Sequence, residues 1–242
     1  MRGRSMGEIT LKLKNILQRI NELAEQRKSV SVPKLIAVSK TKPIEAIVEL
    51  YKCGQYTFGE NYVQELEEKA NNEQIKRECP DIRWHYIGHL QRNKCNRIVK
   101  IPNLECIQTI DSIQLADSLN NACKNVQFSK PLNILLQINT SNEEQKSGIA
   151  PNECLTLYQH VKKNCELLNC LGLMTIGALD NVQSTNNQDF EILLKCRDNL
   201  CEQSSLSVND VELSMGMSSD YEQAILAGST MVRIGSSLFG GR

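Results

Sequence analysis

The chain has 242 residues, of which 40% are hydrophobic and 23% charged, a balance typical of globular rather than disordered proteins. Its 28 Lys and Arg residues match 28 Asp and Glu residues, so the formal net charge is zero. This balance argues against proteins that bind nucleic acids or membrane surfaces, which normally carry a basic excess. No apolar run approaches the about 18–20 residues that cross a bilayer, and nothing marks secretion. We therefore expect a cytoplasmic protein, with a mitochondrial pool as the alternative location.

The ten cysteines are numerous for an intracellular chain, but no two of them form a Cys-x-x-Cys pair. Zinc sites usually contain such closely spaced ligands. A reduced thiol within a helix behaves as a small apolar residue. We therefore predict free, structural thiols in a reducing compartment and no metal site.

The first predicted element is an amphipathic helix within residues 1–30. Its apolar residues recur at helical spacing on one face, which we expect to pack on the rest of the fold: Ile9, Leu13, Ile16, Leu17, Ile20, Leu23 and Ala24. Short apolar runs and amphipathic stretches then alternate, as in βα units. The predicted strands are 35–38, 56–59, 84–88, 105–110, 133–139, 170–176, 211–215 and 231–235. The predicted helices are 43–53, 62–79, 90–100, 112–125, 151–164, 188–204 and 220–227.

Eight strands separated by helices fit a (β/α)₈ TIM barrel, although a doubly wound open sheet would give the same local alternation. The strand count favours the barrel. Because the eight βα units use nearly all of the chain, we expect residues 1–242 to form a single domain. The stretch 180–187, rich in Asn, Ser and Thr, is predicted to be a mobile surface connection.

In such a barrel, functional side chains follow the carboxyl ends of the strands. Lys40 stands two residues after the first predicted strand, where its amine could point into the barrel mouth. A lysine that is shielded from water loses proton affinity and can form a Schiff base with an aldehyde.

The last two strands lead into small residues, with Ser214 to Ser219 after the seventh and Arg233 to Ser237 after the eighth. Small residues let backbone N–H groups approach an anion closely, and barrels commonly bind phosphate at these two strand ends. Together with Lys40, these segments describe a site for an aldehyde that carries a phosphate.

Other polar or cavity-facing candidates follow the middle strands: Glu60, Asn61, His85, His89, Gln91, Asp111, Asn139 and Met174. His85 and His89 have the His-x-x-x-His spacing that binds zinc on a helix, but they fall on a strand end and loop, so we predict no metal there. The chain contains no Walker loop, no G-x-G-x-x-G and no Ser-His-Asp order, which removes the usual signals for NTPases, dinucleotide enzymes and hydrolases.

Seven segments in order resemble one known family: IAVSKTKP, FGENYVQE, WHYIGHLQRNK, QINTSNEEQKSG, GLMTI, ELSMGMSSDYEQAI and GSTMVRIGSSLFG. They are similar to the pyridoxal phosphate homeostasis proteins, single-domain relatives of the barrel half of alanine racemase. The resemblance implies a fold type III barrel that binds pyridoxal 5′-phosphate (PLP), with Lys40 as its Schiff-base lysine. It places Ser218, Arg233, Gly235 and Ser236 in segments associated with the phosphate end. It also matches Asn61, His85, Met174, Ser214 and Met215 to positions that line the cofactor cavity.

The resemblance further implies a role in PLP homeostasis, in which the protein holds PLP and passes it to apo-PLP enzymes as transient partners. Alanine racemases add a second domain that supplies a catalytic tyrosine across a dimer, whereas this sequence ends at Arg242. We therefore expect a monomer that is not an enzyme. The alternatives are a PLP-dependent racemase or related enzyme of weak activity, and a cofactor-free Schiff-base aldolase that acts on a sugar phosphate.

Overall fold

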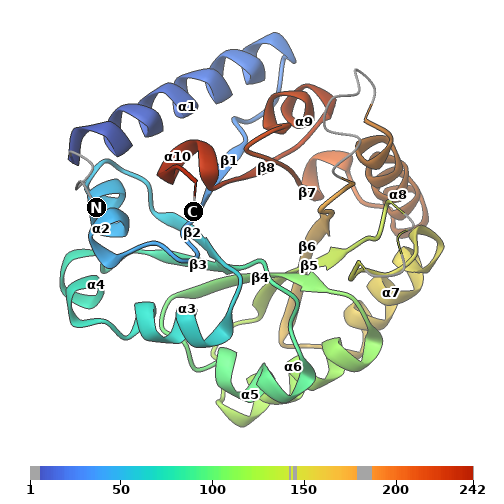
Figure 1. Ribbon diagram of the computed structural model, residues 1–242. Coiled ribbons are helices and arrows are strands. Elements are labelled where there is room, and N and C mark those ends of the chain that lie inside the picture. Colours follow the sequence, from blue (N-terminus) through green and yellow to red (C-terminus); the bar gives the residue numbers. More distant parts are fainter. Residues whose placement is uncertain (1–5, 142, 144–145, 179–186, 242) are drawn as a thin grey trace.

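The computed structural model describes residues 6–141, 143, 146–178 and 187–241. Within these residues, eight parallel strands close into a barrel in the order β1-β2-β3-β4-β5-β6-β7-β8, and β8 pairs with β1. Helices surround the barrel (Figure 1). The predicted barrel is confirmed. The open sheet is excluded because an open sheet has two edge strands, whereas here every strand pairs with two neighbours.

The strands are short, as expected for a barrel of this kind. They span Lys34–Val38 (β1), Thr57–Glu60 (β2), Arg83–Tyr86 (β3), Leu104–Ile110 (β4), Leu132–Gln137 (β5), Leu168–Met174 (β6), Glu212–Met217 (β7) and Met231–Ile234 (β8). The α-helices span Met6–Gln26 (α1), Ile44–Lys52 (α2), Val63–Ala70 (α3), Glu73–Glu78 (α4), Cys95–Ile98 (α5), Ile113–Asn125 (α6), Cys154–Asn164 (α7), Gln188–Ser204 (α8), Tyr221–Ala227 (α9) and Ser236–Phe239 (α10). Single 3₁₀ turns precede α5 (η1, Arg92–Lys94), α7 (η2, Pro151–Glu153) and β7 (η4, Val208–Asp210).

Apolar side chains form two buried layers, because successive strand residues point to opposite faces of the sheet. The larger layer lies between strands and helices and includes Leu35, Phe58, Leu213 and Met215. The smaller layer fills the barrel interior and consists of Ile36, Cys106, Leu135, Met174 and Met231. The barrel interior formed by these residues is therefore a packed core.

Helix α1 lies outside the barrel, alongside α2, α9 and α10 (Figure 1). Its buried face includes Leu13, Ile20 and Leu23. On its polar side the Arg19 guanidinium bonds the Glu222 carboxylate of α9. The helix thus covers the apolar outer side of the last βα units.

Two predicted helices differ from those observed. The predicted helix 62–79 is two helices, because Asn72 leaves helical geometry and its side chain caps α4 through the N–H groups of Gln74 and Ile75. The predicted helix 90–100 shrinks to η1 and α5, while a short helix, α10, begins at Ser236 after β8. Most of the predicted mobile connection 180–187 lies outside the described residues.

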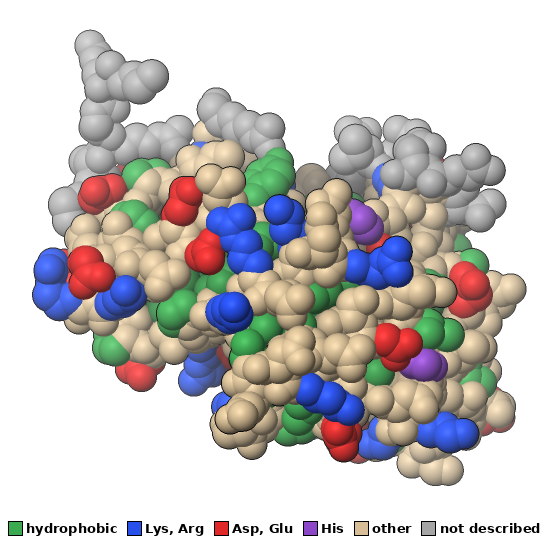
Figure 2. All heavy atoms as spheres, turned by 90° about the horizontal axis from the view of Figure 1, so that it is seen from below, with side chains coloured by type: hydrophobic (Ala, Val, Ile, Leu, Met, Phe, Trp, Pro, Cys, Tyr) green, Lys and Arg blue, Asp and Glu red, His purple; other side chains and the backbone are tan. Residues whose placement is uncertain are grey.

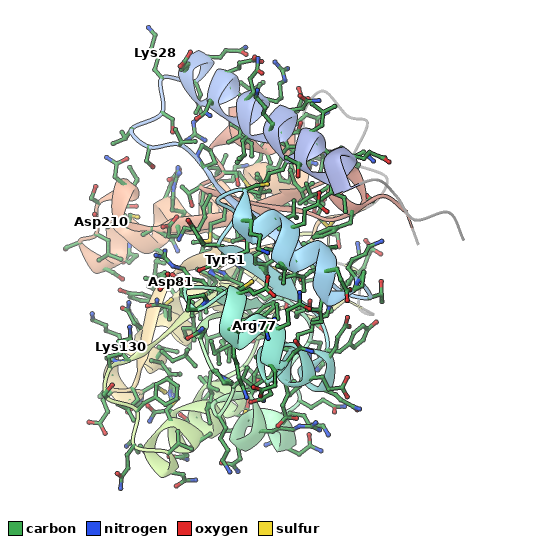
Figure 3. The ribbon with its side chains drawn as sticks, turned by 90° about the vertical axis from the view of Figure 1, so that its left-hand side faces the viewer. Lys28, Tyr51, Arg77, Asp81, Lys130 and Asp210 are labelled. Atoms are coloured by element: carbon green, nitrogen blue, oxygen red, sulfur yellow. The ribbon has the colours of Figure 1, made fainter. Side chains whose placement is uncertain are left out.

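The two ends of the barrel differ in what they expose. Figure 3 shows Lys28, Asp81, Lys130 and Asp210 at the end where strands begin, while the functional candidates follow the opposite ends. Basic and acidic side chains intermingle on the face shown in Figure 2, in line with the zero net charge. All ten cysteines are free thiols. None of the described helices is long and apolar enough to cross a membrane.

Candidate functional site

A cavity of about 400 Å³ opens at the carboxyl ends of β1, β2, β6, β7 and β8. This volume lies within the range of small-ligand sites. It brings together seven of the ten site residues expected from the sequence: Lys40, Asn61, Met174, Ser218, Arg233, Gly235 and Ser236. Residues from both ends of the chain therefore meet in one pocket. Larger hollows lie elsewhere: one along α1 contains none of them, and one beside the start of α3 contains Asn61 alone.

The turn that carries Lys40 is held by a buried ionic cluster. The Lys69 ammonium on α3 donates to the Ser39 carbonyl (2.7 Å), to Glu60 Oε1 (2.8 Å) and to Glu65 Oε1 (2.7 Å). The Ser39 hydroxyl also donates to Glu60 Oε1 (2.7 Å). Burial raises the pKa of Glu60, and the Lys69 charge opposes that rise. The residue before Lys40 is thus fixed by partners that are themselves buried.

The residue after Lys40 is also constrained. Thr41 has φ 62°, a left-handed conformation that is uncommon for a residue with a side chain. Its N–H donates to Glu65 Oε1 (2.5 Å), one of the Lys69 partners. The same ionic cluster therefore stabilises both sides of the Lys40 position.

Asn61 lies at the cavity wall, directly after β2. Its side-chain oxygen Oδ1 is buried and has no hydrogen-bond partner among the described residues. The backbone of Gly88 passes so close that a Cβ at this glycine would lie 2.0 Å from the Asn61 carbonyl oxygen. A buried polar atom without a partner costs free energy, so Asn61 is a group that a bound polar ligand would satisfy.

The ends of β7 and β8 meet around one hydroxyl. Ser218 Oγ accepts from the backbone N–H groups of Gly235 (3.2 Å) and Ser237 (3.3 Å) at the start of α10. Ser218, Gly235 and Ser236 all line the cavity. Donors of this kind, clustered at a strand–helix junction, suit an anion such as phosphate.

Arg233 is the buried cation of the cavity, with only 3% of its surface exposed. Its guanidinium donates to Ser214 Oγ (2.7 Å) and to the Thr175 carbonyl (2.7 Å), both neutral groups. Burial lowers the pKa of Arg233 to about 10, against the opposing charge of Asp220. Its positive charge is therefore held in place by dipoles and remains available to an anionic or electron-rich ligand.

Three expected site residues do not line the cavity. His85 and Ser214 lie inside the barrel beneath it, 1% and 0% exposed, where both hydrogen-bond Gln108. Met215 belongs to the outer apolar layer, because it follows the inward-facing Ser214 and so points to the opposite face of β7. The expectation that Ser214 and Met215 both line one cavity is thus corrected by the alternation of the strand.

Other parts of the site were not predicted from the sequence. Three apolar residues of the cavity wall, Val38, Ile87 and Ile176, were not singled out, whereas Met217 and Ser219 lie in the predicted segment after the seventh strand. Gln108 and the Thr175 carbonyl were not singled out, although both lie in predicted strands. Their alternation with buried apolar neighbours was the one available signal that they face the interior.

The remaining polar candidates lie at the rim or outside the cavity. His89 Nδ1 lies 3.3 Å from Asp111 Oδ2, and burial raises the pKa of Asp111. His85 is inside the barrel and His89 half-exposed, so their spacing brings no ligand pair together. The described residues that could together hold a metal ion, Asp117, His160 and Cys165, lie on or next to α6 and α7, and His160 already pairs with Asp117 at 2.7 Å.

The donor set and the volume fit a phosphorylated aldehyde. The cavity wall includes the Lys40 side chain and the Ser218 hydroxyl, with backbone N–H groups beside it, and Arg233 supplies a buried charge. The unpartnered Asn61 Oδ1 belongs to a further lining residue and can accept a hydrogen bond. Apolar Val38, Ile87 and Ile176 provide surface for a planar ring.

Comparisons with known proteins agree with this geometry. The family model for the alanine racemase N-terminal domain matches residues 11–242. The pyridoxal phosphate homeostasis protein of Mus musculus is 49% identical over 211 residues, covering 87% of this chain and 77% of its own length. That of Caenorhabditis elegans is 42% identical over 230 residues, covering 94% and 93%.

Solved structures show the same barrel. PipY of Synechococcus elongatus PCC7942 with PLP bound has a TM-score of 0.71 and 31% identity, over 92% of this chain and 100% of its own. Alanine racemase of Clostridium difficile 630, at 17% identity and a TM-score of 0.69, shares the fold over 57% of its own length. Fold and cavity thus define a barrel of the alanine racemase N-terminal type. Within that class, the chain belongs to the pyridoxal phosphate homeostasis protein family.

Proposed function

We propose that this protein binds PLP and serves intracellular PLP homeostasis, holding the cofactor on Lys40 as a Schiff base and releasing it to PLP enzymes. The observation that carries the proposal is the meeting of Lys40 with Ser218, Gly235 and Arg233 in one cavity of about 400 Å³. PipY, whose structure was solved with PLP bound, and the relatives named for PLP homeostasis support it.

When bound, PLP supplies an aldehyde that reacts with amines, a ring that withdraws electrons and a phosphate. Lys40 Nζ provides the amine, on a turn fixed by Ser39 and Thr41. The Ser218 hydroxyl and the N–H groups that begin α10 bind the anionic end. Arg233 contributes a fixed positive charge from the cavity floor.

The lining favours a carrier over a racemase. Among the described residues that line the cavity, only Lys40 and Arg233 carry ionisable side chains. Two-base racemisation requires a second group that exchanges a proton near neutral pH, and Arg233 keeps its proton there because its pKa is about 10. The relatives, too, are named for homeostasis and not for a reaction. We further propose a cytoplasmic monomer whose barrel forms the single domain of the chain.

Covalent binding is tested by the absorption spectrum of the protein after PLP is added, followed by borohydride reduction and peptide mass analysis. We expect an absorption band of bound PLP and a pyridoxyl group on the Lys40 peptide. Lys40→Ala should abolish both, whereas Lys130→Ala, an exposed lysine at the opposite end of the barrel, should abolish neither. A wild-type protein with no band and no labelled peptide would exclude PLP binding and favour the cofactor-free aldolase.

The carrier role is tested separately, by mixing PLP-loaded protein with an apo-PLP enzyme and following recovery of that enzyme's activity. We expect recovery at a rate set by release from Lys40. No transfer would contradict the carrier role. Rapid turnover of an amino acid by the loaded protein alone would favour the alternative, a PLP-dependent racemase.

A further inference from the structure

Polar side chains cross the barrel interior below the cavity in one continuous series. Arg233 Nη1 donates to Ser214 Oγ (2.7 Å), and Ser214 Oγ donates to Gln108 Oε1 (2.6 Å). Gln108 Nε2 lies 2.8 Å from His85 Nδ1. The other ring nitrogen, His85 Nε2, faces Glu105 Oε2 at 3.8 Å, an ion-pair distance rather than a hydrogen bond. Four of these side chains, all but Glu105, are at most 3% exposed.

The Arg233 end and the orientation of the Gln108 amide together set the direction of the bonds in this series. A guanidinium can only donate, so Ser214 Oγ accepts from Arg233, and because its other neighbour is the acceptor Gln108 Oε1, it donates its own proton there. The amide of Gln108 is thereby oriented with Nε2 toward His85. His85 Nδ1 must then accept, which places the ring proton on Nε2, toward the carboxylate of Glu105.

We infer that Arg233, Ser214, Gln108, His85 and Glu105 form a directional relay across the barrel, which positions the Arg233 guanidinium for PLP. The inference rests on the proposed function, because it gives Arg233 a ligand to be positioned for. In this relay His85 is a positioning residue: it touches neither the cavity nor PLP, and it acts by orienting Gln108.

The surroundings explain why the relay holds its members firmly. The barrel interior around it is apolar, lined by Ile36, Leu135, Met174 and Met231. In such surroundings an unpartnered polar group is costly, so breaking one link penalises its neighbours as well.

The electrostatics agree with a neutral His85. Burial lowers the pKa of His85 despite the opposing effect of Glu105, and His85 in turn lowers the pKa of Glu105. The other charged groups that face the pair are Lys34 on β1, Arg83 on β3 and Glu212 on β7. They surround the amino end of the barrel, so the relay runs from a charged rim to the cofactor cavity.

Two near-isosteric variants of His85 distinguish the relay from a simple packing role. His85→Leu removes the acceptor for Gln108, whereas His85→Asn can restore one through its side-chain oxygen. Cys106→Ala, in the same interior layer, is the packing control. We expect His85→Leu to weaken PLP binding about tenfold and to raise the pH at which the spectrum of bound PLP changes, because a loosely held Arg233 charge opposes protonation less. His85→Asn should restore both values toward wild type.

Equal behaviour of the Leu and Asn variants, whether both resemble wild type or both resemble Cys106→Ala, would overturn the relay. A second measurement needs no PLP: ¹⁵N NMR of the His85 ring in the unliganded protein, among three histidines in all. We expect a proton on Nε2 and none on Nδ1, and a shift toward the other tautomer in Ser214→Ala, two links away. Ring signals that Ser214→Ala leaves unchanged would overturn the relay even if PLP binding itself were absent.

Discussion

The two sides of the cavity hold their cations in opposite ways. Beside Lys40, the buried ammonium of Lys69 is bound by the carboxylates of Glu60 and Glu65. Beneath β7 and β8, the equally buried guanidinium of Arg233 donates to a hydroxyl and a carbonyl. The first arrangement neutralises its charge by direct ion pairs, whereas the second gives Arg233 no direct ion pair, and the Asp220 carboxylate acts on it only from a distance. One side therefore serves structure, while the other is arranged to receive a negatively charged ligand.

The largest effect on stability is expected at Lys69. Lys69→Met should lower the free energy of unfolding by about 3–5 kcal/mol, because it leaves Glu60 buried without its counter-ion. It should also weaken the attachment of PLP to Lys40, because the Ser39 and Thr41 positions lose their shared partner. Chemical denaturation measures the first effect. Lys52→Met, at an exposed pair with Glu78, is the control and should cost less than about 1 kcal/mol; an equal loss in both variants would contradict the contrast.

Substitution of Arg233 should affect PLP affinity more than stability. Arg233→Met removes a buried charge that has no ion-pair partner but leaves the Thr175 carbonyl without its donor, so the free energy of unfolding without PLP should fall by about 1–3 kcal/mol, less than in Lys69→Met. The affinity for PLP should fall roughly 10- to 100-fold, because a charge-assisted contact is lost. Titration of PLP followed by absorption measures the affinity. A variant that unfolds easily yet binds PLP as tightly as wild type would refute this assignment of roles.

The same contrast explains what the sequence could predict. The βα alternation and the strand-end positions of Lys40, Ser218 and Arg233 are local features, and they led to the barrel and to most of the cavity. The relay was beyond reach because its contacts join distant residues, Ser214 to Gln108 across 106 positions and Arg233 to Thr175 across 58. Such contacts follow from closure of the barrel and its register, not from any local pattern.

Two wrong predictions could have been avoided from the local sequence. Strict alternation along β7 would have placed Ser214 and Met215 on opposite faces. The break at Asn71 and Asn72 within the predicted helix 62–79 carried its own signal, since Asn is a favoured N-cap residue. In both cases a general rule gave better guidance than the overall pattern of the segment.

Lowering the pH should destabilise the protein through the buried, neutral His85. Burial lowers the pKa of His85 below its ordinary 6.5, so as the pH falls through about 6.5 the unfolded chain takes up a proton that the folded chain takes up only at lower pH. The free energy of unfolding should therefore fall as the pH drops below about 6.5, by at most about 1.4 kcal/mol per pH unit. Denaturation at several pH values measures the slope. His85→Asn should flatten it and Cys106→Ala should preserve it; a slope unchanged in His85→Asn would assign the effect to other groups.

The smallest effect is expected at Ser218, where the anion-binding side depends on several weak donors at once. Ser218→Ala removes a hydroxyl from the cavity but leaves the N–H groups of Gly235 and Ser237, which then lose their internal acceptor and can turn fully to the ligand. The loss is worth about 0.5–1.5 kcal/mol, or a two- to tenfold weaker affinity for PLP. Ser237→Ala, which removes an exposed hydroxyl next to the same N–H, is the matched variant. If Ser218→Ala weakened binding as much as Arg233→Met does, the anion would depend on this one hydroxyl, and the shared-donor account of the site would fail.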